Sequence, residues 1–274
     1  MAYLMTGPRR WLLLLGAVWA LGLLVFAYVS SRTDAPTVRE QSSVADARPA
    51  VDRATAYLVT DSGDAVAAVG QFAKVGGCRV SAVRDGERWE RAVVLYTRAG
   101  TEPALLDRLA RELPADYHAR ARHSGDGKVH TLRADAGSYV AVSGTVGAPG
   151  EVRLVVATGC RAASGPVPAS AGQPDPVARA AVQAAFTALD AQPAGWRARA
   201  VPCPAGGALR VVEADSDPGV IPGPLPVRLS SIGPGALVAI PDVYAYRTGS
   251  VSVVVRLTAG GVLTATATTG CADP

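Results

Sequence analysis

The sequence predicts an α+β protein in which an N-terminal transmembrane helix is followed by two tandem repeat modules, each an opening helix plus a mainly antiparallel sheet. Three observations predict this fold class. Residues 11–29 form one long apolar segment, two later regions pass from helical to alternating hydrophobic spacing, and both regions close on Gly-Cys. The expected segments are a cytoplasmic tail (1–10), the transmembrane helix (11–29), a polar stalk (30–53), a first module (54–160), a linker (161–174) and a second module (175–274).

The apolar segment Trp11–Val29 is long enough to cross a bilayer as one helix. At about 1.5 Å per residue it would extend roughly 28 Å, close to the hydrocarbon thickness of about 30 Å. Arg9 and Arg10 precede it, as in a secretory signal, but the apolar region of a signal is shorter, and no small-x-small site or lipobox cysteine follows. We therefore expect an uncleaved signal anchor, with a cleaved signal as the alternative.

Charge alone does not decide the topology, because arginines flank both sides of the segment. The short N-terminal tail and the placement of every cysteine in the C-terminal part favour a C-terminal part outside the cytoplasm, where thiols oxidise.

Arginine far outnumbers lysine, and alanine, glycine, proline and valine are abundant, which indicates a GC-rich bacterial source. The formal charge is only +4, and basic and acidic residues are interspersed, so the sequence has no basic patch typical of a nucleic-acid-binding protein. We expect a single-pass protein of the plasma membrane without a nucleic-acid partner.

The stalk is polar and mixed in charge, and the first module follows it. Apolar residues at helical spacing predict a helix over Asp64–Val75, after a short strand at Thr55–Thr60. A second helix is expected at Thr101–Leu113, with Thr101 as its cap. The remaining strands are expected at Arg88–Thr97 and in two hairpins, Tyr117–His123 with Lys128–Ala134, and Ser138–Val146 with Glu151–Thr158.

The second module begins after a linker rich in proline, alanine, serine and glycine. Asp175 as N-cap, Pro176 in the first turn and an apolar stripe up to Leu189 predict its opening helix. The alternating segment Thr264–Thr268 has little contrast between its faces, so either Cys271 holds its register or it is an edge that receives a partner strand. Strands are expected at Trp196–Val201, Ala208–Glu213, Ser250–Thr258 and Val262–Thr269.

Both modules end alike, with Gly-Ser, a strand, a glycine turn and a second strand that leads to a cysteine. The final cysteines are Cys160 and Cys271, and the earlier ones are Cys78 and Cys203. Four cysteines allow three pairings, and the repeat favours Cys78–Cys160 with Cys203–Cys271. Each such disulfide would contribute on the order of 4 kcal/mol by chain entropy. The alternatives are reduced buried thiols and, less favoured, a zinc site, for which no C-x-x-C pair is present.

All histidines lie in one expected hairpin: His118, His123 and His130. If the turn is tight, His123 pairs with Lys128, so that His123 and His130 share one face while His118 lies on the other with Arg120 and Arg122. The face with two imidazoles then has no matched carboxylate. We therefore interpret these histidines as solvent-facing strand residues rather than metal ligands.

Two acidic groups have ordinary structural explanations. Asp215-Ser216-Asp217-Pro218-Gly219 is similar to the start of a calcium loop, but it lacks the closing glutamate and is also a common turn sequence. Glu102, Asp107 and Glu112 lie beside arginines on an expected helix, where pairing between residues four apart on a solvated face explains them.

No G-x-S-x-G, H-E-x-x-H, Walker or Rossmann motif is present. We therefore expect no catalytic residues, no cofactor and no metal. The expected role is non-catalytic binding, scaffolding or sensing in the bacterial cell envelope, with the membrane bound through residues 11–29 and another envelope protein as a candidate partner. The alternative is a membrane-anchored extracytoplasmic hydrolase, which would need His123 or His130 beside a carboxylate and a hydroxyl.

Overall fold

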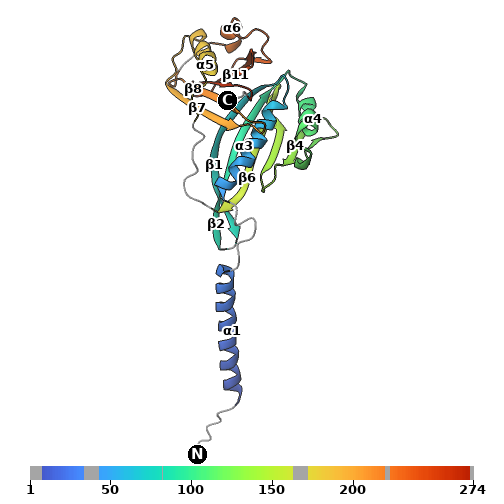
Figure 1. Cartoon of the computed structure of the whole chain (residues 1–274), viewed down its shortest axis with the longest axis vertical. Helices are drawn as coiled ribbons and strands as arrows, with labels where there is room; N and C mark the ends of the chain where they lie inside the picture. The colour runs from blue at the N-terminus through green and yellow to red at the C-terminus, as the bar shows by residue number, and fades with distance from the viewer. Residues whose placement is uncertain (1–7, 34–42, 82, 163–171, 220–222, 272–274) are drawn as a thin grey trace, which may run out of the picture. The chain divides into compact units, whose positions relative to one another are not determined.

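The computed structural model describes residues 8–33, 43–81, 83–162, 172–219 and 223–271 (Figure 1). The chain divides into two compact units, Met1–Gln41 and Ser42–Pro274. The described part of the first unit is a single helix, and the second unit contains both β-sheets.

Helix α1, Pro8–Thr33, contains the whole segment 11–29 that the sequence predicts to cross a membrane. Large apolar side chains of this helix are exposed, among them Trp19, Leu24 and Phe26 at 68%, 69% and 71%. Among the described residues, we find no helix that has both the length and the hydropathy of a membrane crossing. The transmembrane assignment stays a prediction from the sequence.

The second unit opens with helix α3, Val44–Thr60, where the sequence predicted the end of the stalk and a short strand at Thr55–Thr60. Both expectations are wrong. Ser43 caps this helix through a capping box: Asp46 N donates to Ser43 Oγ at 3.1 Å, and Ser43 N donates to Asp46 Oδ2 at 2.9 Å. The composition was misleading because the buried face of α3 consists largely of alanine, supplemented by Val51 and Leu58.

Strand β1, Val66–Ser81, takes the place of the helix expected at Asp64–Val75. Val69 contributes to the core beneath α3, whereas Val66 packs on the other face with Tyr96 and with Val243 of the second module. Because the start of β1 is buried on both faces, its apolar residues do not alternate with polar ones, and their spacing also fits a helix.

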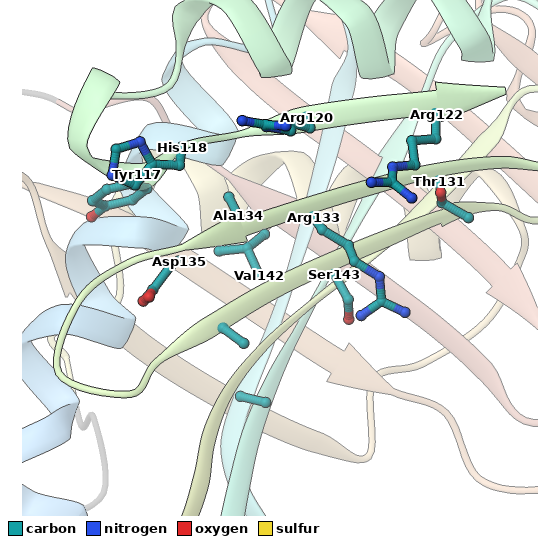
Figure 2. Close-up of a pocket in the computed structure, with 12 residues that line it drawn as sticks. Tyr117, His118, Arg120, Arg122, Thr131, Arg133, Ala134, Asp135, Val142 and Ser143 are labelled. Atoms are coloured by element: carbon teal, nitrogen blue, oxygen red, sulfur yellow. The ribbon is translucent and has the colours of Figure 1, made fainter.

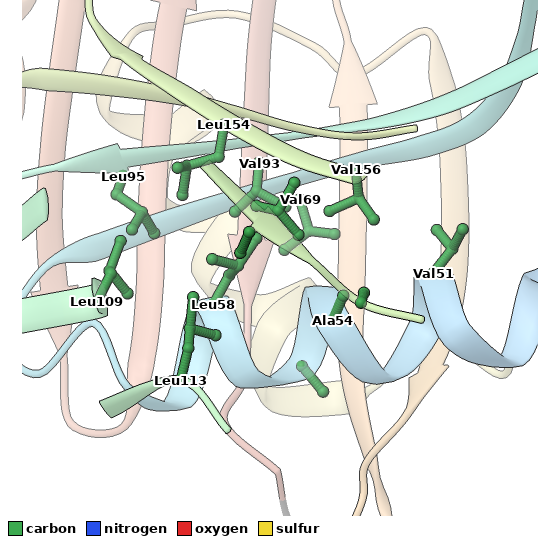
Figure 3. Close-up of a cluster of buried hydrophobic side chains, with 14 of the residues drawn as sticks. Val51, Ala54, Leu58, Val69, Val93, Leu95, Leu109, Leu113, Leu154 and Val156 are labelled. Carbon is green, nitrogen blue, oxygen red and sulfur yellow. The ribbon is translucent and has the colours of Figure 1, made fainter. Parts of the chain in front are cut away.

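The first sheet has six antiparallel strands in the order β1-β2-β6-β5-β4-β3. Helices α3 and α4 cover one face, where Leu58, Leu109 and Leu154 belong to one core (Figure 3). The helix expected after Thr101 and both predicted hairpins are present, although the Thr101 hydroxyl donates to Arg98 O at 2.7 Å instead of capping the helix. The elements are β2 (Arg84–Tyr96), α4 (Glu102–Glu112), the short 3₁₀-helix η1 (Ala115–Tyr117), β3 (Arg120–His123), β4 (His130–Asp135), β5 (Ala141–Val146) and β6 (Glu151–Ala162).

The second module begins with α5, Pro176–Ala188, at the predicted N-cap. Asp175 Oδ1 accepts hydrogen bonds from Val177 N at 3.0 Å and Ala178 N at 2.9 Å. Helices α5 and α6 contact the second sheet, whose strand order is β7-β8-β12-β11-β10-β9. The elements after α5 are β7 (Gly195–Pro202), β8 (Ala208–Asp215), α6 (Leu225–Leu229), β9 (Val238–Ile240), β10 (Val243–Thr248), β11 (Val251–Leu257) and β12 (Leu263–Thr268).

The two modules have the same topology. Among the described residues, each contains a helix, two strands, a helix and four strands, and the two sheets list their strands in the same relative order. This agreement supports the internal repeat predicted from the Gly-Cys endings and gives an α+β fold with two repeat modules. Most of the predicted linker, residues 163–171, lies outside the described residues.

Strand β12 lies inside its sheet, paired with β8 on one side and β11 on the other. The hypothesis that Thr264–Thr268 forms an edge for a partner strand is therefore wrong. Thr266 and Thr268 are only 8% and 1% exposed, and β11 and β12 contact β1 of the first module. The weak contrast between the faces of this strand reflects burial on both of them.

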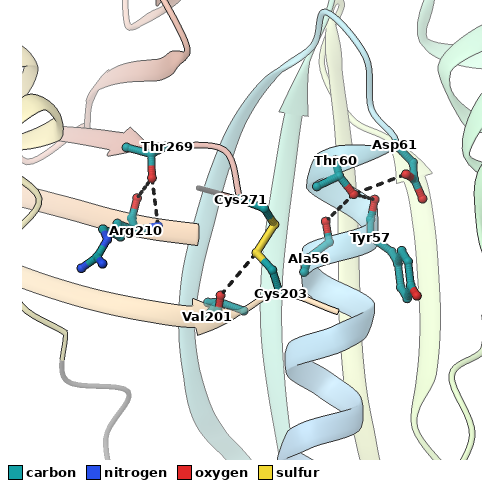
Figure 4. The surroundings of a disulfide bond; sticks show 9 residues. All are labelled: Ala56, Tyr57, Thr60, Asp61, Val201, Cys203, Arg210, Thr269 and Cys271. Atoms are coloured by element: carbon teal, nitrogen blue, oxygen red, sulfur yellow. Dashed lines mark hydrogen bonds between the residues drawn. A yellow bond between two sulfur atoms is a disulfide. The ribbon is translucent and has the colours of Figure 1, made fainter. Parts of the chain in front are cut away.

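Both predicted disulfides are present, and they occupy equivalent places in the two sheets. The first links β1 to β6, which are the two neighbours of β2, and the second links the segments that follow β7 and β12, which are the two neighbours of β8. Thr269 N donates to Arg210 O at 2.9 Å, which holds the chain after β12 beside β8 (Figure 4). The Cα–Cα separations are 5.9 Å for Cys78–Cys160 and 6.0 Å for Cys203–Cys271.

Candidate functional site

A cavity of about 470 Å³ lies on the first sheet, at strands β3, β4 and β5 (Figure 2). Arg120 and Arg122 of β3 and Arg133 of β4 line it, and these residues form the arginine cluster. Hydroxyl groups, one carboxylate and small apolar side chains complete the lining, among them Thr131, Asp135, Val142 and Ser143. The cavity therefore combines guanidinium groups with neutral hydrogen-bonding groups.

Alternation along the strands places the arginine cluster on the face of the sheet away from the helices. Leu132 is fully buried in the core that α4 covers, so its neighbour Arg133 points to the opposite face. In the hairpin register Arg120 lies directly opposite Arg133, and Arg122 lies opposite Thr131. Directly opposite residues have Cβ atoms about 4.5–5.5 Å apart, and like charges there are destabilising. The register thus places two arginines at directly opposite positions on neighbouring strands, although their side chains extend in different directions (Figure 2).

The arginine cluster has no carboxylate partner within ion-pair distance among the described residues. Arg153, on the nearby strand β6, differs because it is paired with Glu151. Asp135 lies at the cavity, but its Oδ1 accepts a hydrogen bond from Gly137 N at 2.9 Å. The cavity therefore carries an excess of positive charge.

The turn that precedes β3 borders the cavity. Tyr117 is 5% exposed, and burial raises the pKa of its phenol while Arg53 acts in the opposite direction. His118 has φ 48°, in the left-handed region that residues other than glycine rarely occupy. This turn sets the direction in which the chain enters β3, and with it the position of Arg120.

The same hairpin brings two histidines and a carboxylate together. His123 pairs with His130 and not with Lys128 as expected, because the loop between the strands is longer than a tight turn. Within this loop, Val129 N donates a hydrogen bond to Ser124 Oγ at 2.9 Å. The two Nδ1 atoms are 2.7 Å apart, and His123 Nε2 lies 3.0 Å from Asp107 Oδ1 of α4. The expectation that these histidines lack a matched carboxylate is wrong.

These three side chains form a chain of contacts rather than one coordination site. Asp107 contacts Nε2 of the His123 ring, and His130 contacts Nδ1 of the same ring. The other nitrogen of His130, Nε2, lies 2.8 Å from Gly127 O. In the part of the chain that the structure describes, no group of three or more His, Cys, Asp or Glu side chains could hold a metal ion. The two histidines contact each other, the Asp107 carboxylate and the Gly127 carbonyl. A Ser-His-Asp arrangement instead needs a hydroxyl group hydrogen-bonded to the histidine that acts as the general base.

The other acidic candidates make structural contacts. Glu102 is 5% exposed and accepts a hydrogen bond from Gly150 N, so the expectation that it lies on a solvated face is wrong. This contact ties the start of α4 to the turn between β5 and β6. Asp215, at the end of β8, forms an ion pair with Arg197 and accepts a hydrogen bond from Thr264 Oγ1 at 2.8 Å. These bonds hold neighbouring strands together.

Part of the arginine cluster could be recognised in the sequence. His118, Arg120 and Arg122 were placed on one face of an expected strand, and all three line the cavity. Arg133 was missed because its place opposite Arg120 depends on the hairpin register, which the loop length sets. Comparisons with protein-family models, with curated proteins and with solved structures found no match for this chain.

Proposed function

We propose that this chain is a single-pass membrane protein of the bacterial cell envelope, with its second unit outside the cytoplasm and with a non-catalytic binding or sensing role. The apolar, exposed side chains of α1 support an anchor, because a lipid environment would remove them from water. The two disulfides, which use every cysteine of the chain, support an oxidising compartment.

The arginine cluster is the observation that carries the binding role. Three arginines line one cavity, and two of them occupy directly opposite positions on neighbouring strands. A ligand with negative charge would relieve this repulsion and would supply the acceptors that the arginines lack among the described residues. The cavity also falls within the range of about 300–1,000 Å³ that is typical of small-molecule sites.

The histidine pair is the observation that favours the alternative, an extracytoplasmic hydrolase. Asp107 could orient His123 as it would orient a general base. In the described part of the chain, however, the other nitrogen of His123 contacts His130 rather than a hydroxyl. Binding through the arginine cluster is therefore better supported than hydrolysis. The proposed partners are the membrane, through residues 11–29, and an envelope protein, without nucleic acid.

The proposed topology can be tested in spheroplasts that produce the full chain. Protease added outside should degrade the second unit, and non-reducing peptide mapping should recover both disulfides. The double variant Leu15→Arg/Leu24→Arg should lose membrane association, because two charges within the apolar part of a spanning helix are costly. Val177→Arg is the matched control, since Val177 is an exposed apolar residue of the second unit at 61%. A protected second unit with reduced thiols would refute the proposal.

The binding role can be tested without knowledge of the ligand. The full chain and the triple variant Arg120→Gln/Arg122→Gln/Arg133→Gln are isolated from native membranes, and the bound material is identified by mass spectrometry. We expect the native chain to retain material that the triple variant loses. Equal retention by both proteins would place binding outside the arginine cluster.

A further inference from the structure

We propose that the arginine cluster binds the phosphate group of a phosphate ester that carries hydroxyl groups. This inference rests on the proposed binding role and names the chemical class of the ligand. The chemistry follows from the number of guanidinium groups, from the hydroxyls between them and from one carboxylate farther along β4.

The number of guanidinium groups favours phosphate over carboxylate. Each arginine presents a planar fork of donors that pairs with two oxygen atoms. A carboxylate has only two oxygens and a single charge, whereas a phosphate monoester has three terminal oxygens and close to two charges at neutral pH. The cluster offers three forks, and two of the three arginines occupy directly opposite positions on neighbouring strands. A phosphate can therefore accept hydrogen bonds from several arginines at the same time.

The remaining polar groups favour an ester with hydroxyl groups over a bare phosphate. Asp135 lies two residues beyond Arg133 on the same strand, hence on the same face and roughly 7 Å away. Its carboxylate repels a second anion but accepts hydrogen bonds from hydroxyl groups. Ser143 of β5 lies opposite Arg133 of β4, and Thr131 of β4 lies opposite Arg122 of β3. These two hydroxyls can donate to phosphate oxygens or bind the hydroxyls of the ester.

The cross-strand repulsion provides a readout that a purely structural role would not give. Arg133 faces Arg120 and has no carboxylate partner within ion-pair distance among the described residues. Arg133→Gln should therefore leave the melting temperature unchanged or raise it while it weakens ligand binding. If Arg133 served only the fold, its removal would lower the melting temperature and leave binding unchanged.

The probes are inorganic phosphate, glycerol 3-phosphate and glycerol, titrated calorimetrically into the full chain in phosphatidylcholine nanodiscs. We expect glycerol 3-phosphate to bind more tightly than inorganic phosphate, and glycerol not to bind. Arg133→Gln should weaken glycerol 3-phosphate binding about tenfold or more, since charge-assisted bidentate bonds are lost. Asp135→Asn should reduce the preference for the ester over inorganic phosphate. Arg84→Gln removes an exposed arginine elsewhere in the sheet and should change none of these affinities.

A second set of nanodiscs distinguishes the two sources of this chemistry. If the natural ligand is a lipid headgroup, lysophosphatidic acid in the discs, a lipid phosphate monoester with a free hydroxyl group, should compete with glycerol 3-phosphate in the native chain. If it is a free phosphate ester, lysophosphatidic acid should have no effect. Binding of glycerol 3-phosphate by the triple arginine variant with native affinity would overturn the inference. No phosphate binding, together with cluster-dependent retention of native material, would refute the phosphate class and leave the binding role standing.

Discussion

The buried ion pair between Asp52 of α3 and Arg91 of β2 provides the most direct test of how the first module is held together. We predict that Asp52→Asn strongly destabilises the second unit, although it changes few atoms. Arg91 is fully buried, and its Nη1 lies 2.6 Å from Asp52 Oδ1 and 3.4 Å from Thr55 Oγ1. Burial lowers the pKa of Arg91, and Asp52 opposes this shift, so removal of the carboxylate takes away the negative charge that Asp52 supplies to this buried guanidinium group.

The expected magnitude follows from the burial of the pair. Removal of one partner of a buried ion pair costs about 3–5 kcal/mol, because the remaining charge is not compensated. For a unit of this size, each kcal/mol shifts the melting temperature by about 2–4 °C, so the shift should be roughly 6–20 °C. The double variant Asp52→Leu/Arg91→Met removes both charges and should recover most of this loss, since apolar replacements of buried pairs are often neutral.

Urea and thermal unfolding of the full chain in detergent, with the disulfides intact, would measure these changes. Glu90→Gln is the matched control, because Glu90 pairs on the same strand with Arg88, whose side chain is 56% exposed. Its loss should cost less than about 1 kcal/mol. If Asp52→Asn costs no more than this control, the buried pair does not anchor α3 to the sheet, and the reasoning fails.

Three further predictions concern packing and pH. Gly86→Ala should destabilise the second unit by about 1–3 kcal/mol, because a Cβ at Gly86 would lie 2.4 Å from Arg161 O; an unchanged urea midpoint would contradict this. Leu154→Ala should cost about 2–5 kcal/mol, since Leu154 is fully buried, whereas Leu154→Met should cost less than about 1.5 kcal/mol in the same assay. Burial raises the pKa of Tyr96 and of Tyr246 to about 12 from 10.0, so the protonated phenols favour the folded state, and the stability that they contribute below pH 10 should be lost as the pH rises towards 12. Absorbance titration of the folded chain should show tyrosines that titrate well above pH 10, and Tyr96→Phe should remove one of them.

The second module was the more predictable half of the fold. Its opening helix has a strong local signal, an aspartate cap followed by proline, and the structure begins α5 at that place. The start of the first module has no such clear pattern. The buried face of α3 contains small residues and the polar Asp52, so its composition does not indicate a core helix. The start of β1 is buried on both faces, so its hydrophobic periodicity does not indicate a strand.

The candidate site divides in the same way. Alternation along one strand was enough to place Arg120 and Arg122 on a common face, whereas His118 lies before β3, in the turn that follows η1. The addition of Arg133 required the register of the hairpin, and the contact between Asp107 and His123 required the packing of α4 against β3. Both depend on residues that are distant along the chain.

The sequence by itself determined the repeat, the pairing of Cys78–Cys160 and Cys203–Cys271, and the α+β class, because turn residues, caps and repeated endings are local signals. The tertiary structure alone decided which strands are neighbours: it placed β12 in the middle of its sheet and set Arg120 opposite Arg133. The physical reason is that strand order depends on which faces bury each other across the whole unit, and a short window of residues does not contain that information.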